Sequence, residues 1–298
     1  MTSSNTKVAV IGAESMVGSR YCQLSNLDLV KADQNGPNKI DITNKESINI
    51  FFNSFEFDWL ILFSAFTDVD NAEKQRNNKN SLAWEINVQG AENIVNLCKS
   101  KNKKIVFIST DYIFDGTSGP YCEQSPYGPN LDKVSWYGIT KIEAEKLVTK
   151  SKVDYIILRI SYPYRAKFDG KDDFARSILK KYRKNELYPL FADQKITPTF
   201  IDDTIAIDLL ISKNQRGIFH LASPKITSPF KFAHLLIKKF NMDPKYLKKA
   251  SLKELLKEEK ITPRPLLGGL NASKIIQKGY IPLDYIQGIS KIHEQNGI

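Results

Sequence analysis

The chain has 298 residues, of which 42% are hydrophobic and 26% are charged, a balance typical of a soluble globular protein with one large domain or two. No apolar run is long enough to cross a bilayer and the first six residues are polar, so we expect neither a membrane span nor a signal peptide. Its three cysteines are scattered without CxxC spacing, which favours reduced thiols in the cytoplasm over a disulfide framework or a zinc site.

The formal net charge of +10 is compatible with nucleic-acid binding. The lysines are spread along the chain, however, and acidic residues stand between them. A solvated surface explains this pattern better, and the excess charge can also attract a small anionic substrate. We therefore expect no nucleic acid and no membrane among the partners, and no metal site.

Residues 7–11 form a β-branched run that ends at Gly12, as a buried parallel strand would. The stretch 12–18, Gly-Ala-Glu-Ser-Met-Val-Gly, leads from this strand into an amphipathic helix. This order predicts a turn that binds a dinucleotide diphosphate at the helix N-terminus. Ser15 replaces the middle glycine of the motif, and a glycine-capped turn without a ligand is the alternative. The expected cofactor contacts here are Gly12, Ser15, Met16, Val17 and Gly18.

A second strand is expected over 27–32, with Asp33 directly after it. An acidic residue about 20 positions after the glycine turn can bind an adenosine ribose and would repel a 2′-phosphate, which favours NADH. A role in the turn over 34–37 is the alternative for this carboxylate. Asp41 and Ile42 lie where side chains could contact adenine.

Helices are expected over 44–55, 68–75 and 82–99, and a third strand over 58–63. The segment after that strand should pass under the cofactor, and it consists of Ser64, Ala65, Phe66 and Thr67. Asn87, inside the last of these helices, is a further expected cofactor contact.

A fourth strand over 104–108 delivers Ser109, Thr110 and Asp111 at its carboxyl end. Ligands of open parallel sheets bind at that end of the strands. A loop rich in glycine and proline over 114–135 then leads to a helix that contains Tyr137.

Tyr137 and Lys141 are four residues apart, so on a helix their side chains share one face. A nearby ammonium favours phenolate and eases proton transfer at an oxygen whose pKa is ordinarily near 10. A hydroxyl of Ser109 or Thr110 could hold a substrate oxygen beside the phenol. Such a set can reduce a ketone when a hydride is supplied. Because the chain is rich in tyrosine and lysine, an ordinary surface turn is the alternative.

A fifth strand over 153–160 completes an alternation of strands and helices that predicts an α/β fold, a Rossmann-type doubly wound parallel sheet. After Ser161 the pattern weakens. It predicts helices over 174–183, 202–212 and 229–240, a strand over 217–222, and a lysine-rich helical stretch up to 262. We expect a dinucleotide-binding domain formed by 1–163 and roughly 201–225, and a smaller carboxy-terminal α/β substrate lobe formed by 164–200 and 226–298.

These features together resemble the extended short-chain dehydrogenase/reductase superfamily and, within it, the dTDP-4-dehydrorhamnose reductases. The most specific part is 109–114, Ser-Thr-Asp-Tyr-Ile-Phe. Related sugar-nucleotide dehydratases carry Asp-Glu after the threonine, whereas here Tyr112 follows Asp111, so the second carboxylate needed for dehydration is missing. The other matching parts are 12–18, Asp33, Asp41, 64–67, 69–73, Asn87, Tyr137, Lys141, 159–161, 193–194, 198–199 and 264–265.

The resemblance implies that Thr110, Tyr137 and Lys141 are catalytic and that the cofactor is NADH or NADPH. Tyr137 would protonate the carbonyl oxygen as hydride reaches the carbon. Lys141 would lower the Tyr137 pKa and bind the nicotinamide ribose, and Thr110 would orient the carbonyl. The cofactor contacts would then include Ser109, Tyr137 and Lys141. The substrate contacts would be Thr110, Asp111, Phe114, Pro198 and Arg264.

Arg264 suits a diphosphate because its guanidinium is a planar fork of donors, although a structural arginine is the alternative. Several departures from the family pattern lie near the expected substrate pocket. Tyr162 replaces a tryptophan, Asp173 an asparagine and Gly268 a serine, and the loop over 123–137 is longer. The chemistry is therefore better defined than the sugar.

We expect a cytoplasmic NAD(P)H-dependent reductase of a nucleotide-linked 4-keto-6-deoxy sugar, for deoxysugar and polysaccharide biosynthesis. One alternative is a sugar-nucleotide epimerase of the same superfamily. The other is a non-catalytic regulatory subunit, because the fold is also used as the β subunit of methionine adenosyltransferase. The sequence leaves open the sugar, the base, the preference between NADH and NADPH, a homodimer, and a metal at an interface.

Overall fold

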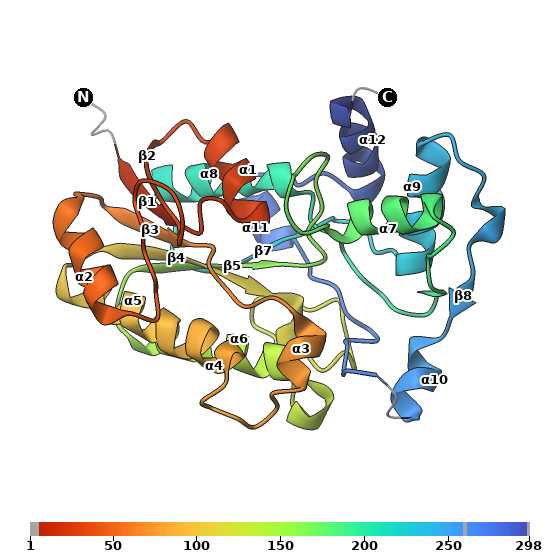
Figure 1. The fold of residues 1–298 in the computed structure, drawn as a ribbon, viewed down its shortest axis with the longest axis horizontal. Coiled ribbons are helices and arrows are strands. Elements are labelled where there is room, and N and C mark those ends of the chain that lie inside the picture. The colour runs from red at the N-terminus through yellow and green to blue at the C-terminus, as the bar shows by residue number, and fades with distance from the viewer. Residues whose placement is uncertain (1–5, 259–260, 297–298) are drawn as a thin grey trace. The chain divides into compact units, whose positions relative to one another are not determined.

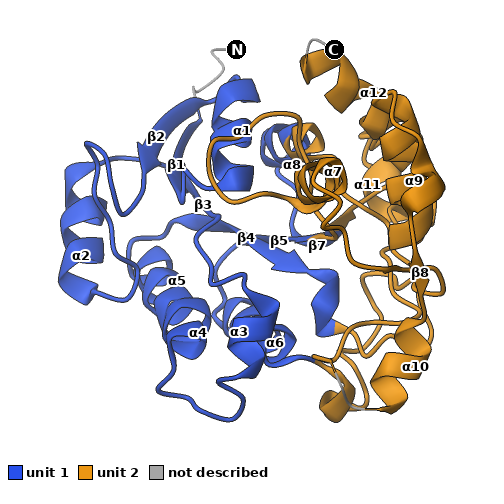
Figure 2. Cartoon of the chain, turned by 45° about the vertical axis from the view of Figure 1, so that its right-hand side comes forward, with its two compact units in different colours: residues 1–113, 135–159, 205–219 blue, residues 114–134, 160–204, 220–298 orange. Residues whose placement is uncertain are grey.

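The computed structural model describes residues 6–258 and 261–296 (Figure 1). The chain forms two compact units (Figure 2). The first comprises 1–113, 135–159 and 205–219, and the second comprises 114–134, 160–204 and 220–298. The segment 114–134 thus groups with the second unit, while the predicted division into functional domains stays a prediction.

A six-stranded sheet organises the first unit, with strand order β2-β1-β3-β4-β5-β7. The strands are β1 (Lys7–Ile11), β2 (Asp28–Ala32), β3 (Trp59–Leu62), β4 (Lys104–Thr110), β5 (Tyr155–Ile160) and β7 (Gly217–Leu221). The pairs β1–β2, β1–β3 and β3–β4 are parallel. The predicted Rossmann-type sheet is confirmed, and its central strands β1, β3, β4 and β5 are mostly buried, as parallel strands covered on both faces require.

Helices cover both faces of this sheet. They are α1 (Met16–Leu24), α2 (Lys45–Ser54), α3 (Val69–Glu73), α4 (Leu82–Trp84), α5 (Ala91–Ser100), α6 (Trp136–Lys150) and α8 (Ala206–Ser212). Helices α1 and α8 lie on one face, and α2, α5 and α6 lie on the other (Figures 1 and 2). Side-chain caps begin several of them, since Ser15, Asn44 and Ser135 each accept a hydrogen bond from the first turn that follows.

The helix expected over 82–99 is interrupted by a π-helical turn over Glu85–Gly90, between α4 and α5. Gly90 in this turn lies against Ile42, where a Cβ atom would come within 2.8 Å of that side chain. π-Turns are uncommon and gather at functional sites. Here the turn contains Asn87, whose side chain is buried.

The second unit is built around α7 (Phe174–Arg183), α9 (Pro229–Lys239) and α12 (Tyr285–Asn296). Its core includes Tyr164, Phe200, Phe232 and Leu236. A two-stranded parallel sheet, β6 (Leu190–Phe191) with β8 (Lys249–Ala250), and the short helices α10 (Leu252–Lys257) and α11 (Ser273–Gln277) complete it.

The prediction of a lysine-rich helical stretch up to 262 is wrong for much of its length. A short 3-10 turn, Pro244–Tyr246, and strand β8 precede α10. The local reason is visible in the sequence, because Asp243 and Ser251 both act as N-caps and so restart the helical pattern. Residues 259–260 of that stretch lie outside the described residues. Over 6–258 and 261–296, no helix has the length and apolar character needed to cross a membrane.

Asp203 is a buried carboxylate in the second unit. It accepts hydrogen bonds from the Tyr280 hydroxyl at 2.9 Å and from the Leu283 amide at 3.1 Å. Burial, with a smaller contribution from Asp202, raises its pKa to about 7, although the two hydrogen bonds act in the opposite direction. Asp203 thus holds the segment before α12 in place. Above neutral pH its carboxylate is charged, and burying that charge is unfavourable.

Because the folded-state pKa of Asp203 is raised, its contribution to stability is present below pH 4 and is lost as the pH rises through about 7. We expect the free energy of unfolding of wild type, relative to Asp203→Asn, to fall by up to roughly 1.4 kcal/mol per pH unit in this window. Urea titrations of both proteins between pH 5 and pH 8 measure the difference. A difference that is constant across this range would contradict the assignment.

Candidate active site

The glycine turn between β1 and α1 depends on its two glycines. Gly12 has a φ of +84°, and a Cβ atom there would lie 2.6 Å from the Ser64 amide nitrogen. A Cβ atom on Gly18 would lie 2.1 Å from the Gly12 carbonyl oxygen. Both positions therefore require glycine, the first for conformation and close approach and the second for helix packing. The turn lies where the sheet order reverses around β1, the usual ligand-binding edge of such sheets.

Ser15, which stands in place of the middle glycine, stabilises the turn. Its hydroxyl donates to the Gly12 carbonyl at 2.7 Å and accepts from the Gly18 amide at 3.1 Å. The side chain therefore lies inside the turn and caps α1. The departure from the glycine motif is thus compatible with the turn that the motif specifies.

Asp33 has contacts of its own at the end of β2. One carboxylate oxygen accepts from the Glu14 amide at 2.8 Å, and the other accepts from the Gln34 amide at 2.8 Å. The carboxylate thus holds the glycine turn in place and also starts the turn after β2. Asp41 accepts from the Thr43 amide and hydroxyl, directly before α2. Contacts of Asp33, Asp41 and the buried Ile42 with a cofactor stay predictions.

Asn87 joins two parts of the site. Its side-chain oxygen accepts from the Phe66 amide at 2.8 Å, and its nitrogen donates to the Phe66 carbonyl at 3.0 Å and to the Thr140 hydroxyl at 2.9 Å. The Thr140 hydroxyl in turn donates to the Tyr137 carbonyl at 2.8 Å. Both amide hydrogens of Asn87 are used, so in this structure the side chain connects the loop after β3 to α6.

The structure brings Thr110 and Tyr137 together. Thr110 is the last residue of β4, and its hydroxyl lies close enough to the Tyr137 phenol to lower the pKa of that group. The Tyr112 amide donates to the Thr110 hydroxyl at 3.2 Å, and the Tyr112 ring packs edge-on against Tyr137 with centroids 6.0 Å apart. A neutral phenol held beside a hydroxyl can donate a proton to an oxygen placed between them.

Lys141 lies one helical turn after Tyr137 and is 3% exposed. Its Nζ donates to the Ile108 carbonyl of β4 at 2.7 Å and lies 4.0 Å from the centre of the Phe107 ring. Burial lowers the Lys141 pKa to about 7, and the negative charge of Glu145 partly opposes this. Glu145 is itself paired with Arg159 at 2.7 Å, and both side chains are buried.

The expected lowering of the Tyr137 pKa is absent in this structure. Burial raises the pKa of the phenol, and the charge of Asp111 raises it further, whereas the Thr110 hydroxyl lowers it. The physical reason is that removal from water disfavours phenolate more strongly than the neighbouring groups favour it. Tyr137 therefore keeps its proton, as a group that begins a reaction as an acid must.

Several observations fit a dinucleotide. The turn provides a glycine cradle that Cβ atoms would fill, and the N-terminus of α1 follows it. Among the described residues, the buried hydroxyl of Ser109 has no hydrogen-bond partner. An unsatisfied buried hydroxyl at the carboxyl end of β4 is suited to a polar ligand atom. Met16, Val17 and residues 64–67 belong to the two segments beside this cradle.

The second unit holds the other expected substrate residues. Phe114 is buried and stacks on Tyr121 with centroids 4.0 Å apart, so its ring supports the surrounding loop. Pro198 is buried, and its carbonyl accepts from the Ser223 amide at 3.3 Å. Arg264 is half-buried. Their roles in substrate binding, like that of the buried Asp111 in the first unit, stay predictions.

Gln194 was not among the predicted site residues, although its segment matches the family pattern. Its nitrogen donates to the Tyr162 hydroxyl and to the Pro265 carbonyl, both at 3.0 Å. Its buried side-chain oxygen has no partner among the described residues. The family match at 193–194 was the signal that could have identified it.

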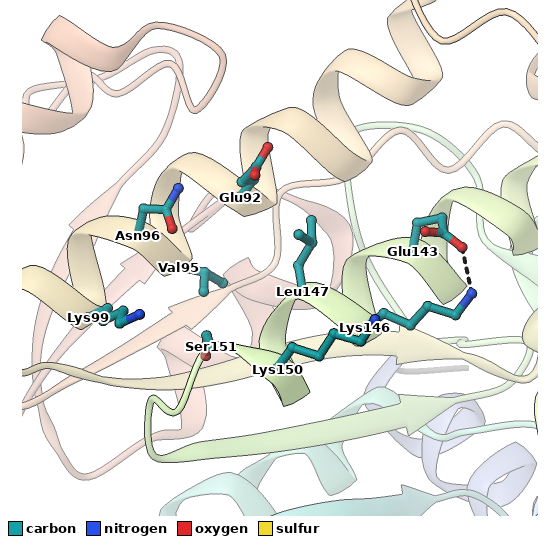
Figure 3. Close-up of a pocket in the computed structure, with 9 residues that line it drawn as sticks. All are labelled: Glu92, Val95, Asn96, Lys99, Glu143, Lys146, Leu147, Lys150 and Ser151. Atoms are coloured by element: carbon teal, nitrogen blue, oxygen red, sulfur yellow. Dashed lines mark hydrogen bonds and ion pairs between the residues drawn. The ribbon is translucent and has the colours of Figure 1, made fainter.

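A cavity of about 280 Å³ lies between α5 and α6 (Figure 3). Most of the residues that line it are charged or polar, and Glu143 and Lys146, both on α6, form an ion pair at 2.7 Å. None of the predicted site residues lines it. The lining residues are Glu92, Val95, Asn96, Lys99, Glu143, Lys146, Leu147, Lys150 and Ser151.

The glycine turn at the sheet reversal and the buried Thr110, Tyr137 and Lys141 define the class: this is the arrangement of the extended short-chain dehydrogenase/reductase superfamily. Within that superfamily the chain belongs to the family described as RmlD substrate binding domain, which matches residues 6–295.

Two relatives match nearly the whole chain. The crystal structure of dTDP-4-dehydrorhamnose reductase from Bacillus anthracis in complex with NADP is 26% identical, with a TM-score of 0.84 over 98% of this chain and 99% of that one. Spore coat polysaccharide biosynthesis protein SpsK of Bacillus subtilis is 27% identical over 278 residues, 93% of each chain.

A third relative comes from another functional class. Methionine adenosyltransferase 2 subunit beta of Xenopus laevis is 27% identical over 209 residues, which is 66% of this chain and 59% of the relative. The similarity to it therefore extends over a smaller part of both proteins.

The contact between Asn87 and Thr140 leads to a stability prediction. Thr140→Val removes the acceptor of a buried Asn87 N–H group, so we expect it to lower the free energy of unfolding by roughly 1–3 kcal/mol. Thr140→Ser keeps the hydroxyl and should retain most of the stability. Thr149→Val is the matched control, because that hydroxyl on α6 bonds only backbone carbonyls. Equal losses in the two valine variants, measured by urea unfolding, would contradict the role of Thr140.

Proposed function

We propose that this protein is an NAD(P)H-dependent reductase of a nucleotide-linked 4-keto-6-deoxy sugar and serves deoxysugar and polysaccharide biosynthesis. The observation that carries the proposal is the buried contact of the Thr110 hydroxyl with the Tyr137 phenol, with Lys141 one turn along α6. The similarity to dTDP-4-dehydrorhamnose reductases supports the substrate class. The unpaired cysteines Cys22, Cys98 and Cys122 are compatible with the cytoplasm, where we place the reaction.

A bound nicotinamide cofactor supplies the hydride. The turn over 12–18 would hold its diphosphate, and Ser109 and Lys141 would hold the nicotinamide ribose. Thr110 donates a hydrogen bond to the substrate carbonyl oxygen and fixes its direction. Tyr137 gives its proton to the same oxygen as the carbonyl carbon accepts the hydride, so the ketone becomes an alcohol.

The residue after Asp111 limits the reaction. Tyr112 stands where a dehydratase needs its second carboxylate, and its amide instead supports Thr110. Elimination of water from the sugar therefore lacks its acid–base partner. Reduction needs only the proton donor and the oriented carbonyl that this site contains.

A regulatory subunit is the second candidate, because of the similarity to methionine adenosyltransferase 2 subunit beta. Such a protein would bind a nucleotide through the same glycine turn without turnover. The buried Tyr137 and Lys141 favour catalysis, since a binding function alone gives no reason to bury a phenol and an amine one helical turn apart.

The decisive experiment supplies a dTDP-4-keto-6-deoxyhexose and NADH or NADPH to the purified protein. We expect one reduced cofactor to be consumed for each sugar reduced, followed by absorbance and product analysis. An epimerase would convert the sugar while the cofactor stays constant. If the sugar is not converted and the cofactor is not consumed, the regulatory subunit becomes the favoured function.

Substitutions then test the assigned roles. Tyr137→Phe keeps the ring and removes the proton, so we expect turnover to fall by roughly 10²–10⁴-fold while cofactor affinity persists. Lys141→Ala should weaken both cofactor binding and turnover, and Thr110→Ala should lower kcat more than it raises KM. Tyr155→Phe in β5 is the control. Near wild-type turnover of Tyr137→Phe would refute the mechanism.

For the cofactor, we propose that NADH binds at least as well as NADPH, because the Asp33 carboxylate would repel a 2′-phosphate. Asp33→Asn keeps an acceptor for the Glu14 amide and removes the charge. We expect it to shift affinity toward NADPH by about fivefold, since a like-charge contact near solvent is worth on the order of 1 kcal/mol. Fluorescence titration of both cofactors measures this, and a wild-type preference for NADPH that Asp33→Asn leaves unchanged would exclude the role.

A further inference from the structure

The first turn of α6 determines where the Tyr137 phenol points. Trp136 begins the helix, Tyr137 is its second residue, and Ser135 is the N-cap. The Ser135 hydroxyl accepts from the Gly138 amide at 3.2 Å. This local cap fixes the backbone on the carboxyl side of Tyr137. The Trp136 N–H group, on the amino side of Tyr137, needs a partner from another segment.

That partner is Glu73, which lies 63 residues earlier in the chain. The Trp136 amide donates to a Glu73 carboxylate oxygen at 2.7 Å. Glu73 is the last residue of α3, whose own start is capped by Asp68. A carboxylate at a helix N-terminus satisfies a backbone donor and interacts favourably with the helix dipole.

Arg76 holds the Glu73 carboxylate in place. Its Nε lies 2.5 Å from one carboxylate oxygen, and one of its terminal nitrogens lies 3.3 Å from the other. The Trp136 ring stacks on Trp84 with centroids 5.5 Å apart, which fixes the same residue from its side chain. The backbone amide and the ring of Trp136 are therefore both held, directly before Tyr137.

We propose that Glu73 is a positioning residue of the reductase, whose carboxylate sets the first turn of α6 and thereby the direction of the Tyr137 phenol. The proposal rests on the proposed function. Glu73 contacts neither reacting group and acts through the Trp136 amide. Because the phenol oxygen lies at the far end of a rigid side chain, a small rotation of the first turn moves it away from the Thr110 hydroxyl.

Three variants test this role. Glu73→Ala removes the acceptor, and we expect kcat to fall roughly 10- to 100-fold, because a misplacement of about 1 Å costs on this order. KM and cofactor affinity should stay near wild type. Glu73→Gln retains an oxygen for the Trp136 amide and should restore most of kcat. Glu143→Ala is the matched control, since it breaks the Glu143–Lys146 ion pair on the exposed part of α6, the helix that carries Tyr137 (Figure 3).

The outcomes are distinguishable. If the wild-type protein does not oxidise NADH or NADPH when the keto sugar is supplied, the proposed function itself is refuted. Active wild type with unchanged kcat in Glu73→Ala overturns only the positioning role, as does a loss confined to KM. A kcat loss in Glu73→Gln as large as that in Glu73→Ala also overturns it, because the hydrogen bond would then not matter.

A fourth variant covers the case in which Glu73→Ala does not fold. Arg76→Ala leaves the Glu73 carboxylate in the chain but removes the group that orients it. We expect a smaller fall in kcat, without a change in cofactor affinity, for protein whose folded fraction is verified by urea unfolding. Wild-type kcat in Arg76→Ala would then overturn the proposal.

Discussion

The hydrogen bond from Lys141 to the Ile108 carbonyl is the contact on which the geometry of the site depends. It joins α6 to β4 within two residues of Thr110, so the helix and the strand place their reactive groups beside each other. A buried ammonium needs an acceptor, and a strand carbonyl provides one without adding a charge. The negative charge of the buried Glu145, which is paired with Arg159, partly opposes the effect of desolvation on the Lys141 pKa.

Polar contacts from distant segments complete this arrangement around one helical turn. Thr140 and Asn87 hold the Tyr137 carbonyl and the loop after β3, and Glu73 holds the preceding amide. Each contact is a hydrogen bond of modest net strength, but each buried donor would be costly to leave unpaired. The turn that carries the proton donor is therefore fixed by its neighbours more than by its own helix propensity.

The sequence predicts those parts of this site whose signals are local. The strand, glycine turn and helix over 7–24 follow from a continuous pattern, and the spacing of Tyr137 and Lys141 places both on one helix. The sequence does not predict the hydrogen bond between the Trp136 amide and the Glu73 carboxylate, because no local pattern links residues 63 positions apart. The direction of the Tyr137 pKa also depends on burial, a tertiary property. The π-helical interruption of the helix over 82–99 was not predicted, because the composition of this stretch is equally suited to an unbroken α-helix.

The π-helical turn over Glu85–Gly90 has a consequence for how this chain tolerates changes in length. Successive helical residues are rotated by about 100°, so removing one residue there would allow a regular helix but turn Asn87 away from Phe66 and Thr140. Substitutions in this stretch can preserve the spacing, whereas a single deletion cannot. The number of residues between α4 and α5 is therefore constrained more tightly than their identity.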